Sequence, residues 1–244
     1  MIKNFETVMA ALSGSGPVTA QIEFSNYEDI FIRPDVLIDL LKGKKVVHLG
    51  CTDHIQLIDY KIREGQFLHN LITCVSKKCI GIDIDTAAIQ KLKEYGITNV
   101  CYGNIEKGSI KEIKEDKWDY LLMGEVLEHI DNPVLFLKRI RENYKDYIDK
   151  AIITVPNAFG LPFLSNAYGK GLEEVNSDHR YWFTPYTLLK VAHRAGLGFI
   201  DLIMCVYENS KNLIYFNKDT FKQKPLLMDT IILVKKYVSW LCTP

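Results

Sequence analysis

Four short motifs carry most of the side chains that could bind a ligand or do chemistry. The first is the turn Gly50-Cys51-Thr52-Asp53-His54, where a glycine lets a ligand approach the backbone closely. A dinucleotide-binding fold needs further glycines after the first one, because the pyrophosphate lies against the backbone there. Only Gly50 is present, and Asp53 adds a negative charge. The turn therefore favours a cofactor that has a cationic group and no pyrophosphate, and a structural tight turn is the alternative.

The second and third motifs offer groups that could bind a nucleoside. Asp83 ends an apolar run, and an acid at this place in nucleoside-binding α/β folds accepts hydrogen bonds from the ribose hydroxyls. Asp85 is better placed to cap the helix that follows. Asn104 has an amide oxygen that could bind the edge of adenine, although asparagine is also an ordinary turn residue. We therefore predict that Asp83 binds a ribose and Asn104 a base.

The fourth motif is Gly124-Glu125-Val126-Leu127-Glu128-His129. Glu125 and His129 are four residues apart, so a helical turn would place them on one face, where they could bind a metal. A metal site needs a third protein ligand, and none stands at a recognisable spacing. The sequence therefore predicts no metal site. His129 could equally pack under the sheet or cap the turn before Pro133.

The composition narrows the classes of partner. The chain has 244 residues, enough for one full α/β domain or two small ones, and its 30 basic residues balance its 30 acidic ones. A neutral chain lacks the basic surface expected of a nucleic-acid-binding protein. The six cysteines form no C-x-x-C pair, and no secretory signal or membrane-spanning apolar stretch is present. We expect a soluble, cytoplasmic protein that acts on a small molecule.

The spacing of apolar residues predicts the elements that position these motifs. Short apolar runs alternate with segments of helical period, which is typical of an α/β domain with a mainly parallel sheet. In such a sheet ligands bind beyond the carboxyl ends of the strands, where the motifs lie. The aperiodic segment Asn157–Asp178 is expected to be a functional insert. The expected strands are 45–49, 79–83, 100–102, 118–123, 151–155, 199–206 and 230–234, and helices are expected at 67–75 and 86–95 and after Pro133 and Pro185.

Taken in order, the motifs resemble those of class I S-adenosylmethionine (SAM)-dependent methyltransferases. The resemblance covers roughly residues 44 to 206. It is greatest to the branch that contains ubiquinone-biosynthesis O-methyltransferases and the methyltransferases of bacterial surface-glycan and natural-product clusters. The matching segments are Val46–Cys51, Gly81–Asp85, Gly103–Glu106, Asp119–His129, Val155–Asn157 and Asp178–Pro185.

The resemblance implies a fold and a domain organisation. It implies a Rossmann-like sheet of seven mostly parallel strands, with helices on both faces and the last strand antiparallel. Residues 1–43 would form an N-terminal extension and residues 44–244 the SAM-binding domain. The segment of about 157–183 would be an insert that contacts the acceptor.

The resemblance also implies which residues bind SAM, whose product is S-adenosylhomocysteine. Gly50 would line the methionine portion of SAM, Asp83 would bind the ribose, and Asn104 would bind the adenine. The implied cofactor-binding set is His48, Gly50, Cys51, Asp83, Ile84, Asn104, Ile105, Gly124 and Glu125. The sequence departs from the family pattern at His48 and Asn104, where the family has Asp, and at Thr52 and His54, where it has glycine.

A methyltransferase of this kind needs few catalytic groups. The leaving sulfur needs no proton, so the protein mainly positions the acceptor and accepts the proton of its hydroxyl. His179 is the first candidate for this base and His129 the second, because the chain from Asn157 onward should fold over the carboxyl edge of the sheet. Asp178 or Glu174 could orient His179, and packing beside Trp182 is the alternative role for this histidine. By analogy with the family branch, we expect O-methylation of a small polar acceptor, such as a sugar or phosphoryl precursor of a surface polysaccharide.

Other functions remain open at this point. The altered turn Thr52–His54 would also suit a SAM-binding pseudoenzyme or scaffold without turnover. A nicotinamide-dependent oxidoreductase or epimerase would need more glycines after Gly50. A non-enzymatic interaction module would use the apolar segment Pro225–Leu241, which could also form a homodimer surface, although a final edge strand explains it more simply.

Overall fold

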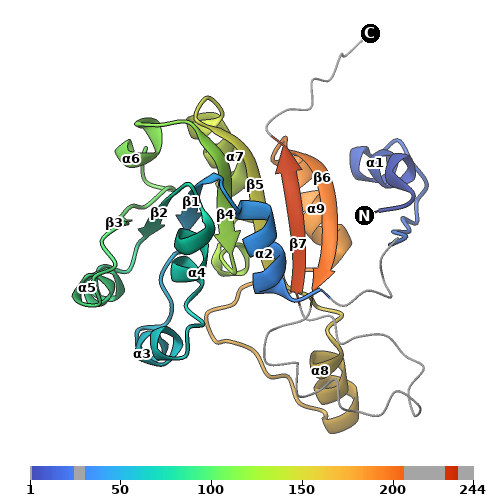
Figure 1. Cartoon of the computed structure of the whole chain (residues 1–244). Helices are drawn as coiled ribbons and strands as arrows, with labels where there is room; N and C mark the ends of the chain where they lie inside the picture. The colour runs from blue at the N-terminus through green and yellow to red at the C-terminus, as the bar shows by residue number, and fades with distance from the viewer. Residues whose placement is uncertain (1, 25–30, 206–228, 236–244) are drawn as a thin grey trace.

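A single mixed sheet forms the centre of the molecule in the computed structural model, which describes residues 2–24, 31–205 and 229–235. Its strands follow the order β3-β2-β1-β4-β5-β7-β6 (Figure 1). Neighbouring strands are parallel except at β7, which is antiparallel to both β5 and β6. The α/β class and the mostly parallel sheet are thus confirmed. The strands are β1 (Lys45–Leu49), β2 (Lys78–Asp83), β3 (Val100–Tyr102), β4 (Trp118–Gly124), β5 (Ile148–Pro156), β6 (Gly198–Cys205) and β7 (Asp229–Lys235).

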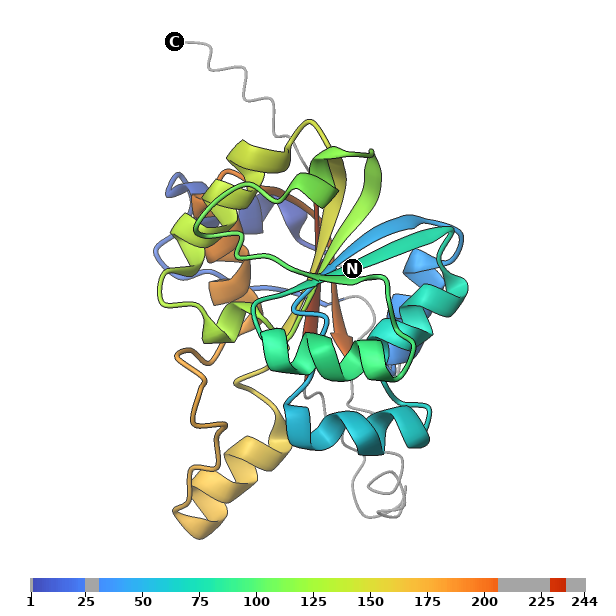
Figure 2. The same cartoon turned by 90° about the vertical axis from the view of Figure 1, so that its left-hand side faces the viewer.

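Helices cover both faces of the sheet (Figures 1 and 2). On one face, Leu12, Leu137 and Leu188 come from three different helices and belong to one core cluster with Val47 of β1. On the other face, helices α2 and α4 form a second cluster with Val46 and its neighbours. Because both faces are buried, the central strands are continuous apolar runs. The helices are α1 (Phe5–Ser13), α2 (Arg33–Leu41), α3 (Ile55–Arg63), α4 (Leu68–Val75), α5 (Thr86–Glu94), α6 (Lys111–Lys114), α7 (Pro133–Tyr144), α8 (Leu161–Leu164) and α9 (Pro185–Arg194), with a 3-10 turn η1 (Leu127–His129) and a π-helical turn η2 (Ser165–Gly169).

Side-chain caps begin the helices where the sequence predicts them. Asp85 Oδ1 accepts hydrogen bonds from the backbone N–H groups of Ala87 and Ala88, both at 2.9 Å. Thr184 Oγ1 accepts one from the N–H of Thr187 at 3.2 Å, ahead of a proline in the first turn of α9. These predictions are confirmed because a cap is satisfied within three residues of itself and depends little on the rest of the fold.

The N-terminal helices pack against the sheet layers. The rings of Phe5 and Phe199 lie 4.8 Å apart, and Lys190 Nζ donates a hydrogen bond to the carbonyl of Leu12 at 2.6 Å. Helix α2 lies on the opposite face and contacts α4. Residues of the predicted N-terminal extension therefore contribute to both core layers.

Three further findings concern the expectations about partners. Among the described residues, no helix combines the length and apolar character that a membrane span requires. The described cysteines are all free thiols. The apolar segment at 225–241, predicted as a final edge strand or dimer surface, overlaps β7 and otherwise lies outside the described residues. The prediction of an edge strand is wrong, because β7 pairs with both β5 and β6 and the edge position belongs to β6.

Candidate functional site

A hollow lies at the carboxyl edge of the sheet, over the ends of β1, β2 and β3. It encloses about 430 Å³, including space that is open to solvent. Its lining includes five residues that the sequence assigned to cofactor binding, which are Gly50, Asp83, Ile84, Asn104 and Ile105. The remaining lining residues are Leu49, Gly103, Glu106, Val126, Ile130 and Phe136. The strand ends thus bring together motifs that are far apart in the sequence, as the parallel sheet predicts.

Asp83 lines this hollow, and its carboxylate is held in place. The side chain is largely buried, and its Oδ2 accepts hydrogen bonds from the Thr52 N–H at 2.9 Å and the Thr52 hydroxyl at 2.8 Å. Its Oδ1 accepts one from the Asp85 N–H at 3.0 Å. An ionised carboxylate has about four acceptor positions, so it can accept a further hydrogen bond from a ligand hydroxyl. Thr52, which replaces a glycine of the family pattern, positions this carboxylate.

A glycine is needed at position 50 because the segment that carries Val126 passes close to the backbone there. Its φ is +70°, and a Cβ built on it would lie 2.4 Å from Cγ2 of Val126. No larger residue fits there without displacing Val126, which itself lines the hollow. The turn after β1 and the segment after β4 therefore form one packed wall.

Asn104 does not offer its amide oxygen to the hollow in the way the sequence predicts. Its Oδ1 accepts hydrogen bonds from the N–H groups of Glu106 at 3.0 Å and Lys107 at 3.2 Å. These bonds shape its own turn, which was the alternative role. The oxygen is already engaged, so the proposed contact from this atom to a base is corrected: recognition of a base would fall to other groups of the turn.

His48 was predicted to contact the cofactor, but it lies beneath the hollow and does not line it. It is 2 % exposed, and its Nδ1 is 3.2 Å from Nδ1 of His69 on α4. Burial lowers the pKa of His69 to about 4. Burial, together with the nearby His69 and Arg33, holds the pKa of His48 well below its usual value. Both rings are therefore neutral near pH 7, and one ring donates the hydrogen bond that the other accepts.

Cys51 also packs into the interior. Its side chain is buried in a cluster with residues of α3 and α5, and its Sγ would lie 2.6 Å from a Cβ built on Gly81. Burial, reinforced by the charge of Asp83, raises the pKa of the Cys51 thiol, so it remains protonated. Only the backbone of this residue is available to a ligand in the turn.

Gly124 and Glu125 end β4 outside the hollow and join a network with α2. Glu125 has a φ of +57°, a conformation that is strained for a residue with a side chain. Its Oε1 accepts a hydrogen bond from the Thr154 hydroxyl at 2.6 Å and lies 3.4 Å from Nη1 of Arg33. Glu125 is therefore not paired with His129, although the two are four residues apart in the sequence.

Asp53, whose charge favoured a cofactor with a cationic group, is paired within the chain. Its carboxylate forms an ion pair with Lys61 of α3. The negative charge of the turn is thus balanced by a neighbouring helix of the same chain.

Two histidines predicted as catalytic lie side by side next to the hollow. The rings of His129 and His179 meet edge to face with their centres 4.7 Å apart. Val126 and Ile130 flank the η1 turn and line the hollow, so the turn that carries His129 borders it. The structure thus brings the first and second candidates for the base to one place, although 50 residues separate them in the sequence.

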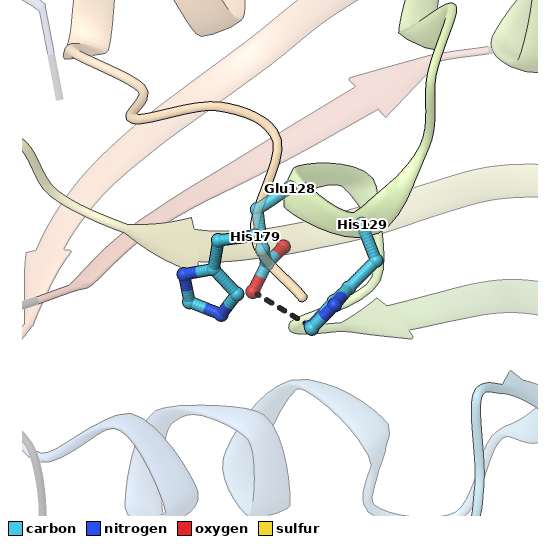
Figure 3. Close-up of side chains that lie close together, drawn as sticks. All are labelled: Glu128, His129 and His179. Atoms are coloured by element: carbon cyan, nitrogen blue, oxygen red, sulfur yellow. Dashed lines mark ion pairs between the residues drawn. The ribbon is translucent and has the colours of Figure 1, made fainter. Parts of the chain in front are cut away.

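Glu128 is the residue that the sequence analysis missed. It is fully buried, and its Oε1 lies 4.0 Å from Nε2 of His129 (Figure 3). Each of Glu128, His129 and His179 offers one oxygen or nitrogen atom, and these atoms all lie within 4.8 Å of one another. The signal available in the sequence was the adjacent Glu128-His129 pair after the end of a strand. The third residue of the cluster, His179, comes from the distant insert, so the sequence alone did not reveal the cluster.

The insert is anchored where it leaves and rejoins the sheet. A parallel bridge pairs Asn157 with Phe183, and the N–H of Ala158 donates to the carbonyl of Phe183 at 2.8 Å. The returning chain then crosses η1, since the N–H of Arg180 donates to the carbonyl of Glu128 at 2.8 Å. Helix α8 of the insert projects beyond the end of the sheet (Figures 1 and 2). These contacts place His179 against the η1 turn.

The groups proposed to orient His179 contact other partners. Asp178 Oδ2 lies 3.3 Å from Nδ1 of His129, and Glu174 accepts a hydrogen bond from the amide of Asn166 at 3.4 Å. Burial and the nearby His129 lower the pKa of His179, which keeps its ring neutral at physiological pH. Its ring centre also lies 6.1 Å from that of Trp182, so the packing contact predicted as an alternative is present as well.

Comparisons with known proteins agree with this fold. A family model described as a methyltransferase domain matches residues 35–202. A magnesium protoporphyrin IX methyltransferase from Synechocystis, solved with bound S-adenosylhomocysteine, is 14 % identical and has a TM-score of 0.51, covering 96 % of this chain and 95 % of its own. A SAM-dependent methyltransferase from Thermotoga maritima is 17 % identical at a TM-score of 0.51, covering 84 % and 87 %. At these identities the likeness to solved structures shows the fold alone. No curated protein matches the chain.

Proposed function

The chain belongs to the methyltransferase domain family, and from this we propose that it is a SAM-dependent methyltransferase that binds the nucleoside of SAM in the hollow. The observation that carries the proposal is the largely buried Asp83 in the lining of a hollow that two glycines also line. A carboxylate with a free acceptor position suits a ribose hydroxyl, and glycines let a ligand approach the backbone. When bound, SAM supplies a methyl group on a cationic sulfur and leaves as neutral S-adenosylhomocysteine.

We further propose that the acceptor is a hydroxyl of a small polar molecule. Support comes from the imidazoles of His129 and His179 at the edge of the hollow, since a hydroxyl must lose its proton as it is methylated and burial keeps the pKa of His179 low. In this arrangement His179 is the first candidate for the proton acceptor. A sugar or phosphoryl precursor of a surface polysaccharide is the acceptor class suggested by the family branch, and it rests on that analogy alone.

The binding site is tested by calorimetry with S-adenosylhomocysteine. We expect wild type to bind it, and Asp83→Asn to bind at least about tenfold more weakly, because the amide replaces one acceptor oxygen by a donor. The control is Asp149→Asn, which changes an exposed acid on β5 and should leave the affinity unchanged. Equal affinities of wild type and Asp83→Asn would refute the assignment of the ribose to Asp83.

The catalytic role of His179 is tested on any acceptor found by screening with labelled SAM. We expect His179→Ala to lower kcat/KM by about 100-fold or more, in line with the usual contribution of a general base. His193→Ala, which removes a histidine of α9, is the matched control. An unchanged kcat/KM in His179→Ala would eliminate this residue as the base.

A SAM-binding protein without turnover is the second candidate function. The specific observation that favours it is the altered turn Thr52–His54, in which Thr52 holds Asp83 Oδ2 in place through both its N–H and its hydroxyl, a contact that serves binding and adds nothing to methyl transfer. This alternative predicts tight binding of S-adenosylhomocysteine and no transfer of a labelled methyl group to any pool of small molecules. Transfer to one purified acceptor would exclude it.

A further inference from the structure

The cluster of Glu128, His129 and His179 has the composition of a metal site. It combines one carboxylate and two imidazoles, whose donor atoms all lie within 4.8 Å of one another. Two ligands of the same divalent ion are roughly 3 to 4 Å apart, because each metal–ligand distance is about 2.0–2.2 Å. The 4.0 Å between Glu128 Oε1 and His129 Nε2 is already close to that range. Small side-chain rotations would bring all three donors to one ion.

A second carboxylate completes the usual surroundings of a metal-binding histidine. Such a histidine almost always directs its other ring nitrogen to a carboxylate or carbonyl, which fixes the ring. Here Nδ1 of His129 faces Asp178 Oδ2 at 3.3 Å, while Nε2 points to Glu128. Nδ1 of His129 forms no hydrogen bond within the described residues, so Asp178 is close enough to fix the ring but would have to turn to accept its N–H.

His179 and Glu128 add independent observations. Nδ1 of His179 is buried and has no hydrogen-bond partner among the described residues. Glu128 is fully buried, and a cation stabilises a carboxylate that is removed from water. Figure 3 shows the Glu128 carboxylate between the two rings. A cation among these groups would bind the buried carboxylate of Glu128 and a ring nitrogen of His179.

We propose that Glu128, His129 and His179 bind one divalent transition-metal ion. Two imidazoles favour Mn²⁺, Fe²⁺, Co²⁺ or Zn²⁺ over Mg²⁺ and Ca²⁺, which prefer sites made of oxygen ligands alone. Asp178 acts as a positioning residue through His129. In this assignment His129 and His179 would be ligands and would not act as the base proposed above. The ion would lower the pKa of an acceptor hydroxyl bound to it, and the proton would leave to solvent water.

The acceptor class follows from the number of protein ligands and rests on the proposed function. Three protein ligands leave positions on the ion open to water or substrate, as in catalytic metal sites. The cluster borders the hollow that we assign to SAM, so an oxygen bound to the ion would lie next to that hollow. We therefore expect an acceptor whose hydroxyl binds the metal, with a neighbouring oxygen as a second ligand.

The test is metal binding by the full chain after treatment with a chelator. Titration with Co²⁺ should produce visible absorption bands that saturate at one ion per chain. His179 and Asp178 are at least partly exposed, so the variants His179→Asn and Asp178→Asn should fold, which circular dichroism can verify. We expect His179→Asn to weaken Co²⁺ binding by at least about 100-fold and Asp178→Asn by about tenfold. The control His193→Asn should bind like wild type. Absence of saturable bands in wild type, or equal binding by His179→Asn, would overturn the proposal.

Two further measurements separate this inference from the proposed function. Binding of S-adenosylhomocysteine is measured on the metal-free chain. If S-adenosylhomocysteine binds and Co²⁺ does not, only the metal site is wrong. If Co²⁺ binds and S-adenosylhomocysteine does not, only the SAM site is wrong. Bound Mn²⁺ should speed the relaxation of water protons, because open positions exchange water. No enhancement with Mn²⁺ bound would contradict a metal-bound acceptor.

Discussion

At the scale of single residues, the hydrogen bonds that a polar side chain already makes within the protein determine which of its atoms can still bind a ligand. Asp83 keeps an acceptor position although it binds Thr52 and Asp85, whereas Asn104 uses its amide oxygen within its own turn. His48 occupies a family position for a cofactor-binding acid but packs on His69. Residue type therefore indicates a possible contact, and the surrounding hydrogen bonds determine whether it is available.

Gly50→Ala tests the wall between the first turn and the segment after β4. We expect the free energy of unfolding to fall by about 2–4 kcal/mol, because the new Cβ would overlap Val126 and the positive φ adds strain. Gly65→Ala is the control, since Gly65 has a φ of +66° but no atom within 4 Å of its Cβ position, and it should lose only about 1 kcal/mol. Urea denaturation measures both values. The wall is not tightly packed if the two variants lose the same amount, or if Val126→Ala fails to rescue Gly50→Ala.

The buried pair of His48 and His69 predicts a dependence of stability on pH. The folded-state pKa of His69 is about 4, against 6.5 for an ordinary histidine, so the unfolded chain binds more protons between these values. Stability is therefore full above pH 6.5 and falls as the pH drops towards 4, by about 3 kcal/mol from His69 alone. Urea unfolding at pH 7.5, 6 and 5 measures this, and His69→Gln should flatten the profile. A profile that is identical in the two proteins would contradict the assignment.

At the scale of elements, local signals determine where helices begin, while long-range pairings determine where the functional turns lie. Caps such as Asp85 act within three residues. The position of η1 depends instead on the returning insert, through the bond from the Arg180 N–H to the Glu128 carbonyl and the bond from the Tyr181 hydroxyl to the Asp131 carbonyl at 2.7 Å. The cluster of Glu128, His129 and His179 therefore forms only because the returning insert is held against the η1 turn.

Asp85→Ala removes the cap of α5. We expect it to lower the free energy of unfolding by about 1 kcal/mol, because the N–H groups of Ala87 and Ala88 lose their acceptor. Asp85→Asn retains an oxygen at the same place and should change stability by less than about 0.5 kcal/mol. Thermal denaturation of the two variants and wild type is sufficient. An equal loss in both variants would show that charge, and not the cap, accounts for the effect.

At the scale of the whole molecule, helices at the N-terminus join core layers built mainly by later residues. Leu12 of α1 is almost fully buried in the cluster that contains β1, β4, α7 and α9. Helix α2 covers the other face and brings Arg33 to Glu125 at the end of β4. The N-terminal segment therefore affects both the stability of the fold and the support of its functional edge.

Leu12→Ala tests whether α1 unfolds together with the rest. We expect a loss of about 2–5 kcal/mol, typical of a cavity in a packed core. Val18→Ala is the control, because Val18 is fully exposed, and it should leave stability unchanged within about 0.5 kcal/mol. Unfolding is followed by circular dichroism and by tryptophan fluorescence. A change in Leu12→Ala that is no larger than in Val18→Ala would mean that α1 is not part of the cooperative unit.

The sequence by itself determined the sheet-forming segments and the edge of the sheet at which the hollow lies. β1 and β3 have the predicted bounds, and the other strands differ from their predicted bounds by one to three residues at an end. Apolar periodicity, glycines and caps suffice for this because they act within a few residues and every βαβ unit has the same handedness. Helix α3 had no such prediction.

Only the tertiary structure decided which polar groups of that edge are available and which meet. It removed His48, Cys51 and Glu125 from the lining of the hollow and placed Glu128 between His129 and His179. The sequence offered no third ligand at a recognisable spacing, because His179 is 50 residues from His129. The physical reason is that a ligand set requires atoms within a few ångströms, and chain folding, not spacing, brings the insert to the η1 turn.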